Sequence, residues 1–314
     1  MVDNIKKKMP THCVVMVTYN HEQYIRTALD SVFDNEILPD KVMLFDDCST
    51  DSTWKIICEY QAKYSSILES HRNEKNLGLF QNINQAYKAA VNSDYDIITD
   101  LAGDDYLKKG VFEELNRVIE ENNVDFKKEK FIIITNTEEL YPDGTVKLFD
   151  NYKLRNEKDL IYYRLIEKLS YREVGLSRNV LKNIELYRSD LGVLADLLVC
   201  LNYETNCDKF YFSPFISAGY RVGVGTVSKN TKNELRKSIY DVDKIILSKY
   251  RLSRKSKSYL KHNMKKIKYE LERDKFDNNV RKNFPIIHYL KFYGIIKTLR
   301  NVIKKINLKW RTQR

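Results

Sequence analysis

The chain is poor in cysteine and lacks long apolar runs, which excludes two large classes of protein. Its five cysteines are scattered, odd in number and never spaced Cys-x-x-Cys. This usage is typical of a reducing compartment and argues against a disulfide framework or a thiolate zinc site. No stretch reaches the roughly 18 consecutive apolar residues of a spanning helix, and no export signal follows the lysines near the N-terminus. We therefore expect a cytoplasmic protein.

Glycine is scarce as well, and the glycine-rich loops that bind phosphate are absent. With ten glycines in 314 residues, the sequence has no Gly-x-x-x-x-Gly-Lys-Ser/Thr loop and no Gly-x-Gly-x-x-Gly after its first predicted strand. Their absence excludes P-loop nucleoside triphosphatases and dinucleotide-binding Rossmann domains. The pair Gly223 and Gly225 lies in an extended segment, where we expect a structural role.

Charge divides the chain into two predicted modules. Residues 231–314 hold 25 lysines and arginines against seven acidic residues, a net charge of +18, whereas residues 1–230 have a net charge of −7. Hydrophobic residues make up 43% of the chain, which is ample for a core. We expect a globular domain at 1–230 and a basic helical tail at 231–314, each meeting different partners.

The first 140 residues alternate between short apolar runs and amphipathic segments. Predicted strands at 13–18, 41–45, 67–71, 95–99 and 131–135 are separated by segments with helical periodicity. Apolar runs without alternation, such as CVVMVT at 13–18, are typical of strands covered on both faces. The sequence therefore predicts an α/β fold with a doubly wound, mostly parallel sheet, followed by a basic α-helical C-terminal module.

Two acidic pairs follow strands of this predicted sheet. Asp46-Asp47 follows the second strand, and Asp104-Asp105 follows the fourth. One interpretation is that they cap helices, because acidic residues suit the positive end of a helix. The other is a divalent cation with a phosphate-bearing nucleotide, because ligands bind outside the carboxyl ends of such strands and carboxylates coordinate hard cations.

Four motifs in register favour the second interpretation. They are VVMVTYN at 14–20, FDDCSTD at 45–51, NLG at 76–78 and LAGDDYL at 101–107. Together they resemble the N-terminal domain of family 2 glycosyltransferases, which have the GT-A nucleotide-sugar fold. The resemblance covers about residues 11–230 and is strongest over 11–125.

The resemblance implies where a nucleotide-sugar would bind. Tyr19 would lie against the base, and Asp47 would hydrogen-bond it, with Asp46 alongside. The other implied nucleotide-sugar-binding residues are Val17, Thr18, Asn76, Gly78, Asn84 and Asp104. A single histidine such as His21, at a helix start, is expected to be a cap or surface residue.

The resemblance also implies a metal and a general base. Asp104 falls on the metal-binding aspartate of the family's Asp-x-Asp signature, and Asp105 follows it, so Mn²⁺ or Mg²⁺ is the implied cofactor. The first aspartate of that signature is replaced by Ala102, which puts the strength of metal dependence in question. Direct inversion needs a carboxylate base; Asp196 matches that position, with Asp190 as the fallback.

The implied function is an inverting glycosyltransferase of bacterial surface polysaccharide synthesis, such as capsule or lipopolysaccharide. It would move a sugar, hexosyl or related, from a nucleotide-sugar donor, a UDP-sugar being favoured, to a glycan or lipid-linked acceptor. Residues 284–314 form a predicted basic amphipathic helix, which would either bind an anionic membrane from the cytoplasmic side or pack on the catalytic domain. Two alternatives stay open: a nucleic-acid-binding protein, which we do not expect because no aromatic platform accompanies the basic residues, and a non-catalytic nucleotide-sugar-fold scaffold.

Overall fold

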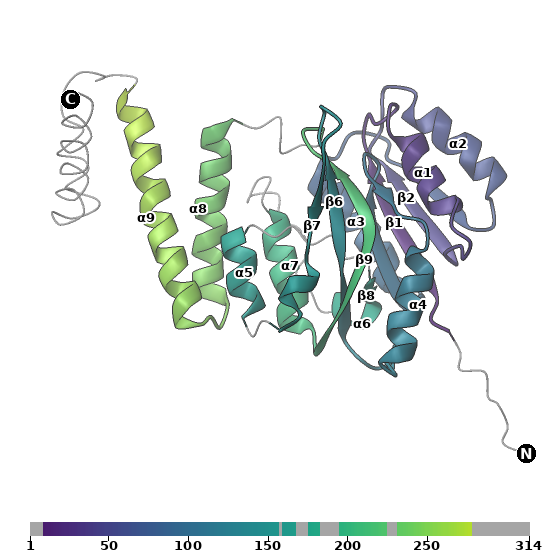
Figure 1. Ribbon diagram of the computed structural model, residues 1–314. Coiled ribbons are helices and arrows are strands. Elements are labelled where there is room, and N and C mark those ends of the chain that lie inside the picture. Colours follow the sequence, from purple (N-terminus) through teal and green to yellow (C-terminus); the bar gives the residue numbers. More distant parts are fainter. Residues whose placement is uncertain (1–8, 157–158, 168–174, 183–194, 225–230, 278–314) are drawn as a thin grey trace, which may run out of the picture.

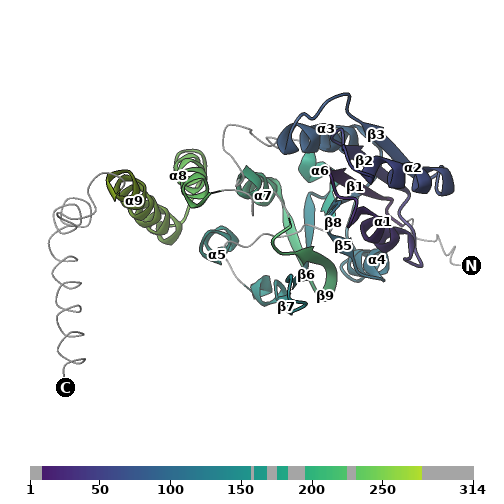
Figure 2. The same cartoon turned by 90° about the horizontal axis from the view of Figure 1, so that it is seen from above.

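The computed structural model describes residues 9–156, 159–167, 175–182, 195–224 and 231–277. A sheet with helices on both faces forms the N-terminal part, and two long helices, α8 and α9, lie beyond it (Figure 1). Seen from above, α7 and α5 lie between the sheet and these helices (Figure 2). None of the helices in the described ranges is long and apolar enough to cross a membrane.

The sheet runs in the order β3-β2-β1-β4-β8-β6-β9-β5, with β7 paired to β6. Its first four strands are parallel, β8 is antiparallel to both of its neighbours, and β9 is parallel to β6. The strands are β1 His12–Thr18, β2 Lys41–Asp46, β3 Leu68–Arg72, β4 Ile97–Ala102, β5 Tyr106–Leu107, β6 Phe131–Leu140, β7 Val146–Phe149, β8 Gly175–Ser177 and β9 Lys209–Arg221. The predicted α/β fold with a mostly parallel sheet is confirmed.

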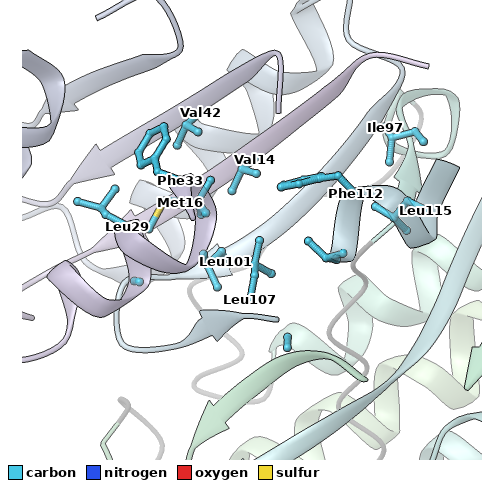
Figure 3. Close-up of a cluster of buried hydrophobic side chains, with 14 of the residues drawn as sticks. Val14, Met16, Leu29, Phe33, Val42, Ile97, Leu101, Leu107, Phe112 and Leu115 are labelled. Atoms are coloured by element: carbon cyan, nitrogen blue, oxygen red, sulfur yellow. The ribbon is translucent and has the colours of Figure 1, made fainter. Parts of the chain in front are cut away.

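Helices cover both faces of the sheet because the central strands have apolar side chains on both faces. The helices are α1 Ile25–Phe33, α2 Thr53–Lys63, α3 Leu79–Asn92, α4 Val111–Glu121, α5 Leu160–Glu167, α6 Arg178–Leu181, α7 Ala195–Asn206, α8 Lys232–Lys249 and α9 Arg254–Asp277, with a 3-10 turn η1 at Tyr152–Asn156. On one face Val14 and Met16 pack against α1 and α4, with Leu29 and Phe112 among their neighbours (Figure 3). On the other face Val15 and its alternates pack against α3, α6 and α7.

One predicted strand is displaced from its expected place. The strand expected at 95–99 is β4, which begins at Ile97 and continues to Ala102. Asp96 precedes the strand, and its carboxylate accepts hydrogen bonds from the Thr11 amide and hydroxyl, both at 3.0 Å, and from Lys127 at 2.5 Å. The strand ends at Ala102, and Gly103 alone separates it from the acidic pair 104–105.

The two C-terminal helices share a small apolar core with α5 and α7. Thr231 and Glu234 form a reciprocal capping box at the start of α8. Arg236 pairs with Glu270 of α9 at 2.9 Å. The apolar cluster joins Leu165 of α5 and Leu198 and Leu201 of α7 to the C-terminal residues Val242, Ile246, Leu252 and Leu260. The predicted amphipathic helix at 284–314 lies outside the described residues.

Candidate active site

The two acidic pairs lie on either side of strand β1. Its residue Val17 is in register with Phe45 of β2 and with Ala102 of β4. Beyond the strand ends, the Asp47 amide donates to the Thr18 carbonyl at 2.9 Å and the Gly103 amide to the Val17 carbonyl at 2.9 Å. Two strand spacings of about 4.8 Å separate β2 from β4, so the pairs after them share one edge of the sheet.

Asp47 is held rigidly by three donors from the segment that follows β3. Its Oδ1 accepts the Leu77 amide at 2.8 Å and the Asn73 side chain at 2.9 Å, while Oδ2 accepts the Gly78 amide at 2.8 Å. Gly78 has a φ of 84°, a left-handed conformation that glycine adopts without strain. The carboxylate is 2% exposed, so its orientation is set before any ligand binds.

Asp46 supports the loop after β2. Its Oδ2 accepts the Ser49 amide at 3.0 Å, Oδ1 accepts the Ser49 hydroxyl, and Arg72 lies 3.4 Å away. Burial raises the pKa of Asp46, although the bonds from Ser49 oppose the shift. The side chain is fully buried, so its described contacts shape the loop.

The loops after β1 and β2 are joined by reciprocal hydrogen bonds. The Asn20 amide donates to the Ser49 hydroxyl at 2.9 Å, and the Asn20 side-chain oxygen accepts the Thr50 amide at 2.8 Å. The His21 amide donates to the Thr53 hydroxyl at 2.8 Å. Asn20 has a φ of 55°, which asparagine tolerates better than most residues. These bonds explain why the motifs at 14–20 and 45–51 belong together.

The turn at residues 103–105, called the acidic turn below, approaches β1 closely because residue 103 is a glycine. A Cβ added to Gly103 would lie 2.6 Å from Thr18 Oγ1 and 3.0 Å from His21 Nδ1. Thr18 Oγ1 and His21 Nδ1 are themselves 3.2 Å apart, and His21 Nε2 is 4.0 Å from Asp104 Oδ2. The structure therefore places His21, expected to be a cap or surface residue, against Asp104.

Asp105 points to β9 instead. Its Oδ1 accepts the Arg221 amide at 2.9 Å, and the side chain is fully buried. The Arg221 guanidinium donates to the Asp104 carbonyl at 2.5 Å. The two neighbouring carboxylates thus have different surroundings: Asp104 faces His21, and Asp105 is bonded to the end of β9.

Asp104 and His21 offer ligand types that Mn²⁺ accepts, a carboxylate and an imidazole. Among the described residues, no group of three His, Cys, Asp or Glu side chains could hold a metal by itself. A cation here would therefore need oxygens from a diphosphate to complete its shell, which is how Mg²⁺ is bound beside substrate phosphates. With diphosphate oxygens as the remaining ligands, the Asp104 and His21 side chains fit such a cation.

The remaining predicted site residues lie at varied distances from this edge. Val17 and Thr18 are buried at the end of β1, and Tyr19 after them is 40% exposed. Asn76 accepts the Gly78 amide at 2.9 Å, and Asn84 lies in the second turn of α3. Asp190 lies outside the described residues, and of Asp196 only the backbone, in the first turn of α7, is described. The roles of these residues stay predictions.

Four residues of the site were not expected from the sequence: His21, Asn73, Asn82 and Arg221. Asn73 bridges Asp47 and Asn82 at 2.9 Å each, and Asn82 donates to the Phe45 carbonyl at 3.0 Å. Asn73 and Asn82 lie on either side of the NLG motif, so their position beside this motif could have indicated them as site residues. Arg221 lies more than a hundred residues from Asp104, and no pattern in the sequence indicated it.

Comparison with known proteins agrees with this geometry. Residues 13–160 match the model of glycosyl transferase family 2. An uncharacterised protein of Mycobacterium tuberculosis is 36% identical over 94 residues, 30% of this chain and 26% of the relative. An uncharacterised glycosyltransferase of Mycoplasma genitalium is 36% identical over 106 residues, 33% of this chain and 35% of the relative. The aligned part thus spans about a third or less of these relatives.

Solved structures of S. aureus TarS share the fold. TarS 1–349 in complex with UDP-GlcNAc has a TM-score of 0.61 at 18% identity, over 86% of this chain and 76% of that one. The same fragment with UDP has a TM-score of 0.59 at 19% identity, over 83% and 71%. The resemblance seen in the four motifs is confirmed, because residues 13–160 match the model of glycosyl transferase family 2.

Proposed function

We propose that this protein is an inverting glycosyltransferase that moves a sugar from a nucleoside-diphosphate-sugar to a glycan or lipid-linked acceptor. One observation carries the proposal. The Asp47 carboxylate with its donors Asn73, Leu77 and Gly78, here called the Asp47 cradle, lies at the same edge of the sheet as the Asp104–His21 pair. This edge is where doubly wound sheets bind ligands, and it lies within the family 2 segment.

The Asp47 cradle supports recognition of a base. A carboxylate offers about four acceptor positions, and the Asp47 carboxylate already accepts three described donors. The position left on Oδ2 suits one N–H of a base, as the imide of uracil would provide. TarS structures in complex with UDP and UDP-GlcNAc share this fold, so we favour a UDP-sugar donor and a hexosyl or related transfer.

The acidic turn supports a role at the diphosphate. When bound, Mn²⁺ or Mg²⁺ would act as a Lewis acid on the leaving phosphate. Asp104 would hold the cation, with His21 beside it, while Asp105 is bonded to β9. Asp196, with Asp190 as the fallback, would accept the proton of the acceptor hydroxyl. Asp104 is 6% exposed, so its charge is shielded from bulk water.

The test is a screen of nucleotide-sugars for hydrolysis and transfer, with and without Mn²⁺. We expect turnover of one donor class by the wild type. Asp104→Ala should lose at least about a hundredfold, as removal of a transition-state contact does, while keeping its circular dichroism spectrum. Asp143→Ala, in the exposed turn of the β6–β7 hairpin, is the matched control. Full activity of Asp104→Ala would overturn the metal assignment, and UDP binding without turnover of any donor would favour the scaffold alternative.

We also propose a setting for the reaction: bacterial surface polysaccharide synthesis at the cytoplasmic side of the membrane. Over residues 232–268, exposed lysines and arginines outnumber exposed acidic residues twelve to one. Such a surface favours contact with anionic lipid at about 1 kcal/mol per basic residue near the headgroups. The basic surface of residues 232–268 therefore supports attraction to a membrane that carries a lipid-linked acceptor. This argument does not depend on the predicted helix at 284–314.

Vesicle flotation tests this attraction. The full chain should float with vesicles containing anionic phosphatidylglycerol and not with phosphatidylcholine alone, and removal of 284–314 should weaken the binding. A gel shift with random duplex DNA is the parallel assay. Binding to DNA at physiological salt without binding to anionic vesicles would favour the nucleic-acid alternative.

A further inference from the structure

Arg221, the last residue of β9, joins a strand from the second half of the chain to the acidic turn. Its amide donates to Asp105 Oδ1 at 2.9 Å, and its guanidinium donates to the Asp104 carbonyl at 2.5 Å. The next amide, that of Val222, donates to the Leu140 carbonyl at 2.9 Å. The turn is therefore tied to the β6–β9 ladder as well as to β1.

Two aromatic rings fix the guanidinium. Its central carbon lies 5.2 Å from the centre of the Tyr24 ring and 5.1 Å from that of Tyr106. Both distances fall within the range of cation–π contacts. Tyr24 precedes α1, and Tyr106 follows the acidic turn in β5. Arg221 is thus held from both of the segments that flank the candidate site.

The fold around Tyr106 is built to keep this arrangement. Tyr106 is in register with Gly219 of β9, where a Cβ would lie only 2.0 Å from the Tyr106 ring. The Tyr106 hydroxyl donates to Glu138 at 2.6 Å, and Lys108 pairs with the same carboxylate at 2.5 Å. These contacts hold the Tyr106 ring in place against the Arg221 guanidinium.

We propose that Arg221 is a positioning residue for Asp104: its guanidinium, held between Tyr24 and Tyr106, fixes the main chain that carries the Asp104 carboxylate. Only the expected effect on turnover rests on the proposed glycosyltransferase function; the positioning of Asp104 does not. The bond to the Asp104 carbonyl restrains the peptide on the C-terminal side of Asp104, and the bond to Asp105 restrains the next residue. A carboxylate displaced by about 1 Å loses much of its effect on a reacting group.

A matched pair of variants separates this role from a general contribution to stability. Arg221→Ala removes the guanidinium bond and both ring contacts, but keeps the main-chain bond to Asp105. Arg155→Ala is the control and removes one ring contact and one bond to a main-chain carbonyl, because Arg155 lies 4.3 Å from the Tyr152 ring centre and donates to the Tyr152 carbonyl at 3.0 Å. Arg221→Lys keeps the charge against the rings and loses the planar fork.

Three measurements on the full chain test the proposal. Hydrogen exchange of peptides covering 101–107 reports the acidic turn without any substrate, and peptides of β1 serve as the internal reference. Calorimetric titration with Mn²⁺ and UDP, alongside donor hydrolysis at varied Mn²⁺, reports the position of Asp104. In Arg221→Ala we expect about tenfold faster exchange in the turn, the size of one lost hydrogen bond to a charged donor, and a half-saturating Mn²⁺ concentration raised at least about fivefold.

The expected pattern is a change confined to the turn, absent from Arg155→Ala and partly reversed in Arg221→Lys. Unchanged exchange at 101–107 in Arg221→Ala would overturn the proposal, whatever the enzyme does. Acceleration of β1 and the turn together would also count against it, since that is general destabilisation. If the wild type turns over no donor while the exchange result is as expected, the positioning role stands and the proposed function fails.

Discussion

Gly103 shows at the scale of a single residue why this turn needs a glycine. Its backbone conformation is one that other residues adopt, but the space beside it is filled by Thr18 and His21. The Thr18 hydroxyl and β-carbon would lie 2.6 and 2.8 Å from a new Cβ. The glycine is therefore required by close approach of two loops, and the site geometry depends on it.

We predict that Gly103→Ala lowers the free energy of unfolding by about 1–3 kcal/mol, the usual cost of overpacking, and weakens Mn²⁺–UDP binding. Urea denaturation measures the first effect and calorimetry the second. Thr18→Ala in the same chain should restore part of the stability, because it removes the nearest atom, Oγ1. A double-mutant coupling energy below about 0.5 kcal/mol would show that contact with the Thr18 hydroxyl does not cause the loss of stability.

The acidic residues were predictable from the sequence because strand ends mark them. Asp47 and Asp104 follow apolar runs whose carboxyl ends must lie at one edge of a parallel sheet. Their partners were not predictable on the same grounds. Arg221 reaches Asp104 only through the pairing of β9 with β5 and β6, and no periodicity in a single sequence encodes that pairing. His21 was placed by the tight approach of Gly103 to Thr18, which sequence patterns do not report.

At the scale of elements, the sequence predicted what was local. The first strands lie within a few residues of their expected places, because their apolar runs are buried on both faces, and α1 to α4 lie in the segments of helical periodicity that follow them. The antiparallel insertion of β8 between β4 and β6, and the parallel pairing of β6 with β9, join distant segments. Their energy comes from contacts that form only after the chain has folded back, so propensity gives no indication of them.

Helix α4 and strand β9 are linked by a carboxylate whose titration should be visible. Glu114 accepts hydrogen bonds from Arg117 at 2.6 and 2.8 Å and from the Ser213 hydroxyl. The bonds from Arg117 are the main cause that lowers the pKa of Glu114 below its ordinary 4.5. The unfolded chain therefore binds this proton at higher pH than the folded one, so the stabilisation is present above pH 4.5 and is lost as the pH falls further.

We predict that Glu114→Gln flattens the fall of stability with acid. Between about pH 5 and pH 3 its free energy of unfolding should decrease less than that of the wild type, because Gln cannot be protonated in this range. Guanidinium denaturation at stepped pH provides the curves. Glu120→Gln, exposed on the same helix, is the control. Equal slopes for wild type and Glu114→Gln would mean that the Arg117 bonds do not distinguish the two protonation states.

At the scale of the whole molecule, the basic C-terminal part shares an apolar cluster with the part before it. Charge predicts a boundary at residue 230, yet the apolar cluster beneath α8 and α9 crosses it. Leu165, Leu198 and Leu201 come from before the boundary, and Val242, Ile246 and Leu260 from after it. Tyr250 and Asn202 add a hydrogen bond across the same contact. Charge and packing thus divide the chain differently, because surface charge reports partners whereas burial reports stability.

We predict that residues 1–230 alone are destabilised and self-associate, since removing α8 and α9 exposes the leucines of α5 and α7 to water. Burial of each such side chain is worth about 1.5–3 kcal/mol. In the full chain, Ile246→Ala should cost about 2–4 kcal/mol and shift a single unfolding transition, because Ile246 is fully buried in the shared cluster. Differential scanning calorimetry and light scattering measure both. A monomeric 1–230 fragment with the melting temperature of the full chain, or two separate transitions in the full chain, would instead establish residue 230 as a true domain boundary, with the basic helices serving their partners alone.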